Sequence, residues 1–496
     1  MPNLSPSAPK AALWLALLGM GAALALLPLK VAAAAVAGGA MGILLLLRPA
    51  WGLYLLIPAI PFGSVAQVSL GGASIGAVEA LLALMLASWL AQMTARREVV
   101  IPHPPLLWPF LLFLATVGLS WWNTFSLAGS LVETLKWLEM LALYLFLAAR
   151  FRPPETGRLV TVILLAGLAQ AGVGLYQFLF KAGPEGFLLF GGRFLRAFGT
   201  FRQPNPYAGY LGLVLPLALS VTLWSADRFR ARRDAPSLAW LALGGASLGG
   251  MLAALFASQS RGGWIGFAGA AVITVLLMGG RWTAAAVAGL SGTALAVSMG
   301  ALAILPPAVT QRFADVLPYA GVTDVSTIPV TDANFAAIER LAHWQAARAM
   351  WLDHFWLGVG FGNYAAVYPA YAVGRWLDPL GHAHNYLLNI GAEAGLVGLL
   401  GYLLFWGWVI LFSLHALRRT EPNTLQRAVV AGGLGIFTHL HLHNLFDNLY
   451  VQGMYLHVAV IFGLITLVAG RGGRIGGLGD SEIGRFGDSE IGRFGD

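Results

Sequence analysis

The sequence predicts an all-α fold, a polytopic transmembrane helical bundle. Hydrophobic residues make up 58% of the 496 residues and charged residues only 10%, whereas soluble globular domains carry about 25% charged residues. The apolar runs approach the roughly 20 residues that cross a hydrocarbon core as a helix, and barrel strands need only about 10. We therefore expect about 12–14 helices and a lipid bilayer as the first partner.

The predicted spans follow one another along most of the chain. They are 11–29, 31–47, 51–66, 77–93, 105–122, 134–150, 158–180, 206–224, 238–257, 263–279, 283–304, 386–413, 427–445 and 450–469. The third is short and contains Pro58 and Pro61, which favours either a bent crossing or a re-entrant segment. The first lacks a small-residue cleavage site, so it is expected to be a retained helix rather than a signal peptide.

The spans and the segments between them suggest five parts of the chain. Residues 1–150 are N-terminal transmembrane helices, 151–304 are transmembrane helices with two arginine-bearing loops, and 305–385 form one large loop. Residues 386–470 are C-terminal transmembrane helices. Residues 471–496 are a polar, glycine-rich tail with the octamer GDSEIGRF repeated, which is typical of a disordered segment.

The charged loops predict the orientation of the chain. The segment DRFRARRDAP, 227–236, holds four arginines and is expected on the cytoplasmic side, together with both termini. Alternation then places 181–205, 258–262 and 305–385 on the opposite, outer side of the membrane. The net charge of +8 therefore reports orientation, and no nucleic-acid partner is expected. The absence of cysteine excludes disulfides and thiolate metal ligands.

Basic residues nevertheless occur in the two short loops that should be depleted of them. Arg196 and Arg202 flank the stretch AFGTF, and Arg261 follows SQS at a predicted helix junction. Such side chains can simply extend to the membrane surface. Alternatively they hold an anion, because a guanidinium makes paired hydrogen bonds to phosphate and stays charged.

The large loop contains an apolar pattern with helical spacing over 334–352. Trp344 and Trp351 suit the headgroup zone, so we expect an amphipathic helix lying at the membrane interface. Arg340 and His343 lie one turn apart on it. A loop of this length in a membrane protein is more often functional than a spacer.

The stretch GHAHNYLL places His382, His384 and Asn385 directly before a long apolar span. One interpretation is a solvated or helix-capping cluster at the interface. The other is an active site in which a histidine acts as a general base near neutral pH. Two histidines without an adjacent acidic residue or cysteine make a weak metal motif, so no metal and no cofactor are expected.

Four stretches in the same order resemble a known family. They are LRAFGTFRQPNPYAGYL, SQSRGGWIG, ERLAHWQAARAMWLDHFWLGVGFGNY and HAHNYLLNIGAEAGLVG. Together, from about residue 150 to 410, they resemble the O-antigen ligase and O-antigen polymerase superfamily, which are GT-C-type glycosyltransferases of the bacterial inner membrane. The resemblance implies a membrane glycosyltransferase that acts at the periplasmic face and takes its glycan from undecaprenyl pyrophosphate. Its acceptor would be a lipid A-core sugar in a ligase, or another lipid-linked glycan in a polymerase.

The resemblance also implies roles for individual residues. Arg196 and Arg261 would bind the diphosphate, with Arg202 beside them, and His384 would be the catalytic base. Transfer would be inverting and independent of metal. The segment Arg202–Gln203 departs from the family, where many relatives have a shorter polar pair before Pro-Asn. The supporting residues would be Arg340, Asn385, His382 and Asn205.

Four other functions stay open at this stage, one of which is a transferase that glycosylates a protein. A polymerase would join lipid-linked repeat units and would share the same motifs. A membrane transporter should show charges or broken helices near the bilayer midplane, often in two repeated halves. A non-catalytic scaffold would tolerate replacement of His384. The clustering of polar residues at one predicted face favours surface chemistry.

Overall fold

The computed structural model describes residues 18–19, 22, 25–63, 65, 67–70, 73–189, 192–300, 319, 321–331 and 334–470. Most of the predicted span 11–29 and the repeated tail lie outside the described residues. The chain divides into two compact units, Met1–Ile101 and Pro102–Asp496. This division falls earlier than residue 150, where the sequence motifs begin.

The first unit contains three described helices and one hairpin. Its elements are α2 (Leu29–Leu47), α3 (Ala50–Phe62), β1 (Gln67–Leu70), β2 (Ala73–Gly76) and α4 (Ala77–Ala95). β1 and β2 pair antiparallel, and the Gln92 side chain on α4 donates to the carbonyl oxygen of Leu46 at 2.8 Å. Pro58 and Pro61 lie inside α3. With 13 residues and a rise of about 1.5 Å per residue, α3 is shorter than a bilayer core.

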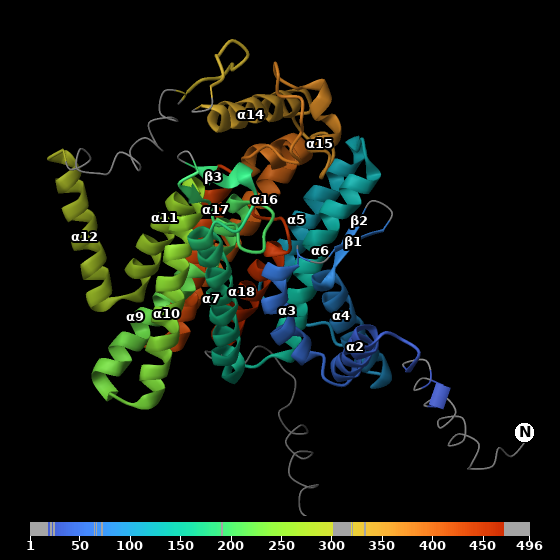
Figure 1. Ribbon diagram of the computed structural model, residues 1–496, viewed down its shortest axis with the longest axis vertical. Coiled ribbons are helices and arrows are strands. Elements are labelled where there is room, and N and C mark those ends of the chain that lie inside the picture. Colours follow the sequence, from blue (N-terminus) through green and yellow to red (C-terminus); the bar gives the residue numbers. More distant parts are fainter. Residues whose placement is uncertain are drawn as a thin grey trace, which may run out of the picture. The chain divides into compact units, whose positions relative to one another are not determined.

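The second unit is a helical bundle. Its helices are α5 (Leu107–Ser120), η1 (Trp121–Asn123), α6 (Leu127–Arg150), η2 (Pro153–Glu155), α7 (Thr156–Phe180), η3 (Glu185–Phe187), α8 (Pro204–Gly212), α9 (Leu215–Arg232), α10 (Ala235–Ser258), α11 (Arg261–Met278), α12 (Gly280–Ser298), α14 (Phe335–Asp353), α15 (Tyr364–Val367), η6 (Tyr368–Ala370), α16 (Tyr386–Arg418), α17 (Leu425–Asn444) and α18 (Met454–Ala469). Strands β3 (Leu188–Leu189) and β4 (Phe194–Leu195) form a short hairpin. The predicted all-α polytopic fold is confirmed (Figure 1).

A described helix occurs at every predicted span from 31–47 to 450–469. Among the described residues, 7 helices are long and apolar enough to cross a membrane, and Ala50–Phe62, Leu107–Asn123 and Met454–Ala469 are shorter apolar helices. The 7 long apolar helices are fewer than the roughly 12–14 helices expected from apolar runs alone. Charged and imidazole side chains explain part of the difference: α6 carries Glu133, Lys136 and Glu139, and α17 carries three histidines.

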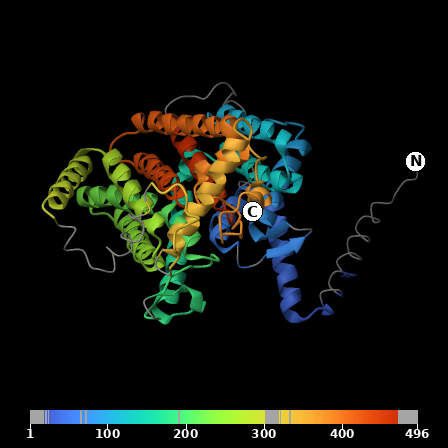
Figure 2. The same cartoon turned by 90° about the horizontal axis from the view of Figure 1, so that it is seen from above.

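The long helices of the second unit bring two sets of loops together at opposite ends of the bundle. At one end, the indole nitrogen of Trp224 donates to the carbonyl oxygen of Asn423 at 3.0 Å, and Arg427 donates to that of Met278 at 3.0 Å. These contacts join α9 to the loop between α16 and α17, and the start of α17 to the end of α11. At the other end, which we call the α14 end, α14 lies across the bundle (Figures 1 and 2).

The helix α16 is broken within its length. Gly395 has φ 65° and ψ −165°, so the backbone leaves the helical conformation there. The loop after α14 pairs with the backbone at the break. Leu396 N–H donates to the carbonyl oxygen of Phe355 at 2.8 Å, and Val359 N–H donates to that of Ala392 at 2.9 Å. The Glu393 carboxylate accepts from Tyr364 N–H at 2.9 Å. The break therefore anchors the segment between α14 and α15 to the bundle.

Candidate functional site

Arg196 is fixed at the junction of two helices at the α14 end. It follows β4, and its neighbour Ala197 donates its N–H to the carbonyl oxygen of Ala257 near the end of α10 at 3.0 Å. The Arg196 guanidinium donates from Nε to the Ser258 carbonyl oxygen at 2.9 Å and from Nη2 to Oδ1 of Asn205 at 3.0 Å. The Asn205 side chain thus helps to orient Arg196, which gives the predicted supporting residue a physical role.

Arg261 occupies the first turn of α11. Ser260 caps this helix, because its hydroxyl accepts from Gly263 N–H at 3.4 Å. The first turn of a helix presents peptide N–H groups and the positive end of the helix dipole. A guanidinium at this position therefore adds to a backbone that already favours an anion.

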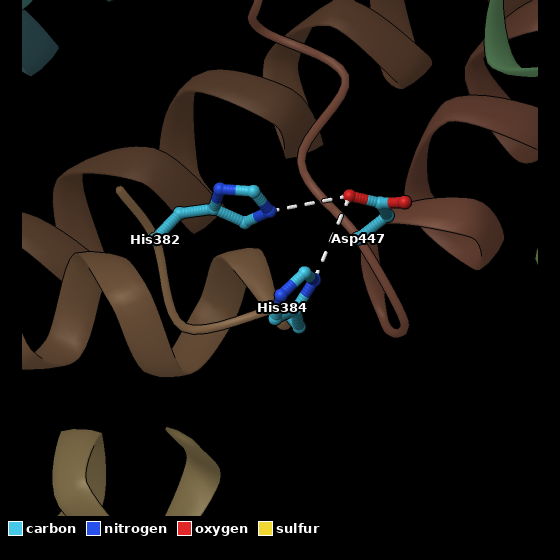
Figure 3. A group of neighbouring side chains, drawn as sticks. All are labelled: His382, His384 and Asp447. Carbon is cyan, nitrogen blue, oxygen red and sulfur yellow. Dashed lines mark hydrogen bonds and ion pairs between the residues drawn. The ribbon is translucent and has the colours of Figure 1, made fainter. Parts of the chain in front are cut away.

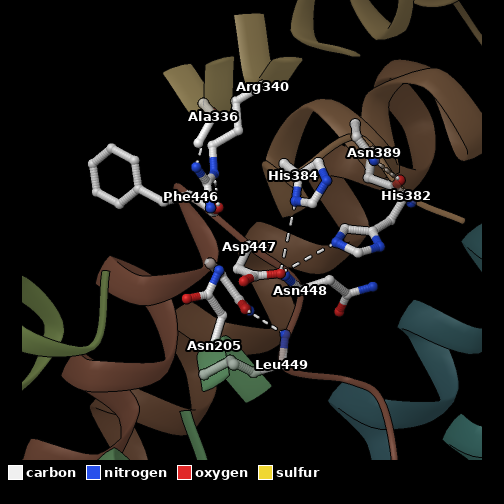
Figure 4. Close-up of polar contacts among 12 residues, drawn as sticks. Asn205, Ala336, Arg340, His382, His384, Asn389, Phe446, Asp447, Asn448 and Leu449 are labelled. Atoms are coloured by element: carbon white, nitrogen blue, oxygen red, sulfur yellow. Dashed lines mark hydrogen bonds and ion pairs between the residues drawn. The ribbon is translucent and has the colours of Figure 1, made fainter. Parts of the chain in front are cut away.

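Arg340 connects α14 to the end of α17. Its Nη1 donates to the Ala336 carbonyl oxygen at 2.9 Å, and its Nε donates to that of Phe446 at 3.2 Å (Figure 4). These two bonds direct the guanidinium from α14 toward the segment after α17.

The three arginines line one cavity of about 600 Å³ at the α14 end. They come from segments far apart in the sequence, and only the folded bundle brings them together. Its other polar lining includes Asn205, Ser260, His443 and Asp447, and its apolar lining includes Ile265, Tyr319, Leu341, Trp344 and Phe446. A cavity of this volume, with one cationic region in a largely apolar wall, suits an amphipathic anionic ligand.

A carboxylate joins the two predicted histidines to this cavity. Asp447 lines the cavity, and its Oδ1 accepts a hydrogen bond from His382 Nε2 at 3.2 Å. The same oxygen lies 3.9 Å from His384 Nδ1 (Figure 3). Burial by itself would raise the pKa of Asp447, but the hydrogen bond from His382 and the electrostatic attraction of the neighbouring imidazoles hold that pKa well below its usual range. Asp447 is therefore a carboxylate at neutral pH.

His384 lies behind Asp447 rather than in the cavity wall. Both of its ring nitrogens are buried, and neither has a hydrogen-bond partner among the described residues. The indole of Trp344 donates to the His384 carbonyl oxygen at 3.3 Å, so α14 covers this histidine. Burial lowers the pKa of His384 to about 3; His382 and Arg340 also lower it, and Asp447 opposes them. The imidazole is consequently neutral at physiological pH.

Asn385 caps the helix that follows. Its side-chain oxygen accepts from the N–H groups of Leu387 and Leu388, both at 3.1 Å. This places its side chain on the first turn of α16, where it satisfies two backbone donors. A capping role accounts for the asparagine at this position.

Two residues from the sequence motifs lie away from the cavity wall. Arg202 is exposed and is not a lining residue of the cavity. His343 is buried beneath α14, where its Nδ1 shares a 2.8 Å hydrogen bond with the Tyr364 hydroxyl and its ring stacks on Tyr368. Arg340 and His343 are one turn apart, yet they point into different surroundings.

The histidine cluster is also the place where the described residues could hold a metal ion. One ligand atom each from His382, His384 and Asp447 lie within 4.8 Å of one another. Two imidazoles and a carboxylate form a donor set that zinc accepts. The hydrogen bond between His382 and Asp447 satisfies the same atoms without an ion.

Sequence reasoning did not identify Asp447 or His443 as site residues. Both line the cavity: His443 lies in the last turn of α17, and Asp447 lies in the segment that follows this helix. Helical spacing could not relate the two, because the helix ends at Asn444. The pairing of Asp447 with histidines more than 60 residues away has no local signature.

The comparisons with known proteins identify one family. Residues 246–403 match the family described as O-antigen ligase. The matched segment runs from α10 into α16 and contains Arg261, Arg340 and His384. A search of curated proteins found no match. Over residues 246–403, the chain is therefore similar to the O-antigen ligase family.

Proposed function

We propose that the protein transfers a glycan from undecaprenyl diphosphate to an acceptor hydroxyl at the α14 end, which faces the periplasm. The convergence of Arg196, Arg261 and Arg340 on one cavity beside Asp447 is the observation that carries this proposal. The ligase family supports a glycan-transfer reaction at a membrane. The cationic region of the cavity fits the diphosphate, and its apolar wall fits the lipid next to it.

The arginines would act on the leaving group. When the glycosidic bond breaks, negative charge develops on the undecaprenyl diphosphate. Guanidinium groups that are already held in place stabilise this charge more in the transition state than in the ground state. Arg196 is held by two acceptors and Arg340 by two carbonyl oxygens, so little reorganisation is required. No divalent ion is needed for this stabilisation.

His384 would take the proton of the acceptor hydroxyl as that hydroxyl attacks C1 of the donor sugar. A single displacement inverts the configuration at C1. Burial and Arg340 keep the pKa of His384 low, and a bound diphosphate would offset the charge of Arg340 and raise that pKa. Asp447 would stabilise the imidazolium that forms. Because His384 lies behind Asp447, acceptor binding would include a side-chain movement that exposes the imidazole to the cavity and keeps the Asp447 carboxylate beside it.

The test is transfer by the purified protein in nanodiscs, with undecaprenyl-diphosphate-linked glycan, lipid A-core and excess EDTA. A glycan-capped lipid A-core with inverted anomeric configuration is the expected product. Longer lipid-linked chains without use of lipid A-core would instead support the polymerase. Loss of transfer in EDTA that zinc restores would assign the His382, His384 and Asp447 cluster to a metal. No turnover with either acceptor would contradict the proposal.

A further inference from the structure

One histidine that lines the cavity, His443, is not used by the mechanism above. It lies in the last turn of α17, its side chain is 1% exposed, and it lines the cavity with Arg196 and Arg261. A buried imidazole in a cationic wall requires an explanation, because burial of a polar ring is unfavourable unless its nitrogens have partners. The two ring nitrogens of His443 lie in different surroundings.

One nitrogen points into the bundle. Nδ1 of His443 lies 3.3 Å from Nε2 of His439, one turn earlier on α17, and the two share a hydrogen bond. His439 is fully buried. When His439 carries its proton on Nε2, it donates to Nδ1 of His443, and the proton of neutral His443 is then on Nε2.

The other nitrogen lies against the arginine-bearing turn of α11. A Cβ placed on Gly262 would lie 2.8 Å from Cδ2 and 3.0 Å from Nε2 of His443. Any larger residue after Arg261 would therefore displace this ring. The glycine lets Nε2 approach the backbone of the turn that we propose for diphosphate binding.

We infer that His443 is a further diphosphate-binding residue, which donates a hydrogen bond from Nε2 to a phosphate oxygen of the lipid-linked donor. This inference rests on the proposed function. A diphosphate offers only acceptors, and the arginines supply charge at the wall. An imidazole N–H adds a directed donor at the floor of the cavity, next to Arg261. His439 sets the tautomer of His443 and is a positioning residue.

Two substitutions of His443 distinguish a side chain that donates a hydrogen bond from one that only fills space. In His443→Gln the amide nitrogen reaches roughly the place of Nε2, whereas in His443→Asn it stays near the place of Nδ1. The measurement is the inhibition constant of undecaprenyl diphosphate in competition with the lipid-linked donor, and its dissociation constant from nanodisc-embedded protein. We expect His443→Asn to weaken binding about tenfold, as for one hydrogen bond to a charged group, and His443→Gln to stay within about threefold of the parent.

Gly262→Ala provides a test that leaves the histidine in place. The added methyl group would move the ring, so undecaprenyl diphosphate should bind about as weakly as in His443→Asn. Gly249→Ala on α10 is the matched control, because nothing lies within 4 Å of a Cβ there.

Equal affinities in the parent, His443→Asn and Gly262→Ala, or equal losses in the Asn and Gln variants, would overturn the inference. If Arg261→Ala also leaves diphosphate affinity unchanged, the proposed function itself fails; if only that variant weakens binding, the role of His443 alone is wrong.

Discussion

At the scale of single residues, arginines from the same sequence motif differ in whether they line the cavity. Arg196 and Arg261 line the cavity, and Arg202, in the same loop as Arg196, is exposed and outside its wall. We expect Arg196→Ala and Arg261→Ala each to lower kcat/KM for the lipid-linked donor at least about hundredfold, because a guanidinium that meets developing charge contributes a few kcal/mol.

Arg202→Ala is the internal control for those two variants. It removes the same charge from the same loop, but from an exposed position. Steady-state rates with donor concentration varied, and a thermal unfolding curve for each variant, complete the comparison. A loss in Arg202→Ala as large as that in Arg196→Ala would show that the loop charge, rather than the cavity, governs donor use.

The buried histidines also predict how stability responds to acid. Burial lowers the pKa of His343 to about 4 and that of His384 to about 3, whereas an unfolded histidine has a pKa near 6.5. Between these values the unfolded chain binds more protons, so the free energy of unfolding falls as the pH falls from about 6.5 toward 4. Each imidazole contributes at most about 1.4 kcal/mol per pH unit.

The measurement is the thermal unfolding midpoint in detergent from pH 7.5 to 4.5. We expect the midpoint to fall with acid, and to fall less steeply in His384→Asn than in the parent. His415→Asn, which changes an exposed histidine at the far end of α16, should leave the slope unchanged. An identical slope in His384→Asn and the parent would mean that His384 is solvated rather than buried.

The residue types and their order along the chain were sufficient to single out Arg196, Arg261 and Arg340, which the fold brings to one cavity. The arginines were found because they contradict the charge pattern of membrane loops, and His384 because it precedes a helix beside another histidine. The sequence could not show that Asp447 pairs with this cluster, or that Arg202 is exposed and outside the cavity wall. Both depend on side-chain directions in segments that meet only after folding.

At the scale of elements, the break in α16 explains a feature that resembles a transporter. Glu393 is buried in a membrane-spanning helix beside a non-helical residue, which is a pattern found at transport sites. Here its carboxylate accepts the N–H of Tyr364, and the loop after α14 pairs with the freed backbone. The break thus supports the segment between α14 and α15, whose Val359 belongs to the same core cluster as Ala383, the residue before His384. Periodicity could not predict it, because Gly395 looks like any other of the 62 glycines.

Gly395→Ala tests this element. A Cβ at Gly395 would lie 2.3 Å from the backbone carbon of Trp356, and φ of 65° disfavours a side chain. We expect a clearly lower thermal unfolding midpoint and loss of transfer, because the segment between α14 and α15, which packs with Ala383 next to His384, would shift. Gly407→Ala on the same helix has nothing within 4 Å of its Cβ and should be neutral. Equal stability of the two variants would mean that the break does not anchor the loop.

At the scale of the whole molecule, hydropathy predicted where the helices occur, but it did not predict which of them are buried. The α18 segment is buried along nearly its whole length, whereas α12 has no buried residue among its described side chains. Both read as apolar spans in the sequence. Lipid and protein interior are equally apolar, so a hydropathy pattern cannot distinguish a central helix from a peripheral one.

The two ends of the second unit give a prediction about orientation. Arginines gather at the end formed by the loops after α9 and α16, and the cavity lies at the α14 end. Because basic loops are retained in the cytoplasm, we expect the cavity to face the periplasm.

The chain contains no cysteine, so a single introduced thiol reports one position. The exposed residues Thr327, before α14, and Arg230, on α9, are suitable sites. In cells with a permeabilised outer membrane, an impermeant maleimide should label Thr327→Cys at once and Arg230→Cys only after the inner membrane is opened. The unsubstituted protein, which cannot react, is the blank. Labelling in the opposite order would put the cavity in the cytoplasm, where a donor presented at the periplasmic face could not reach it.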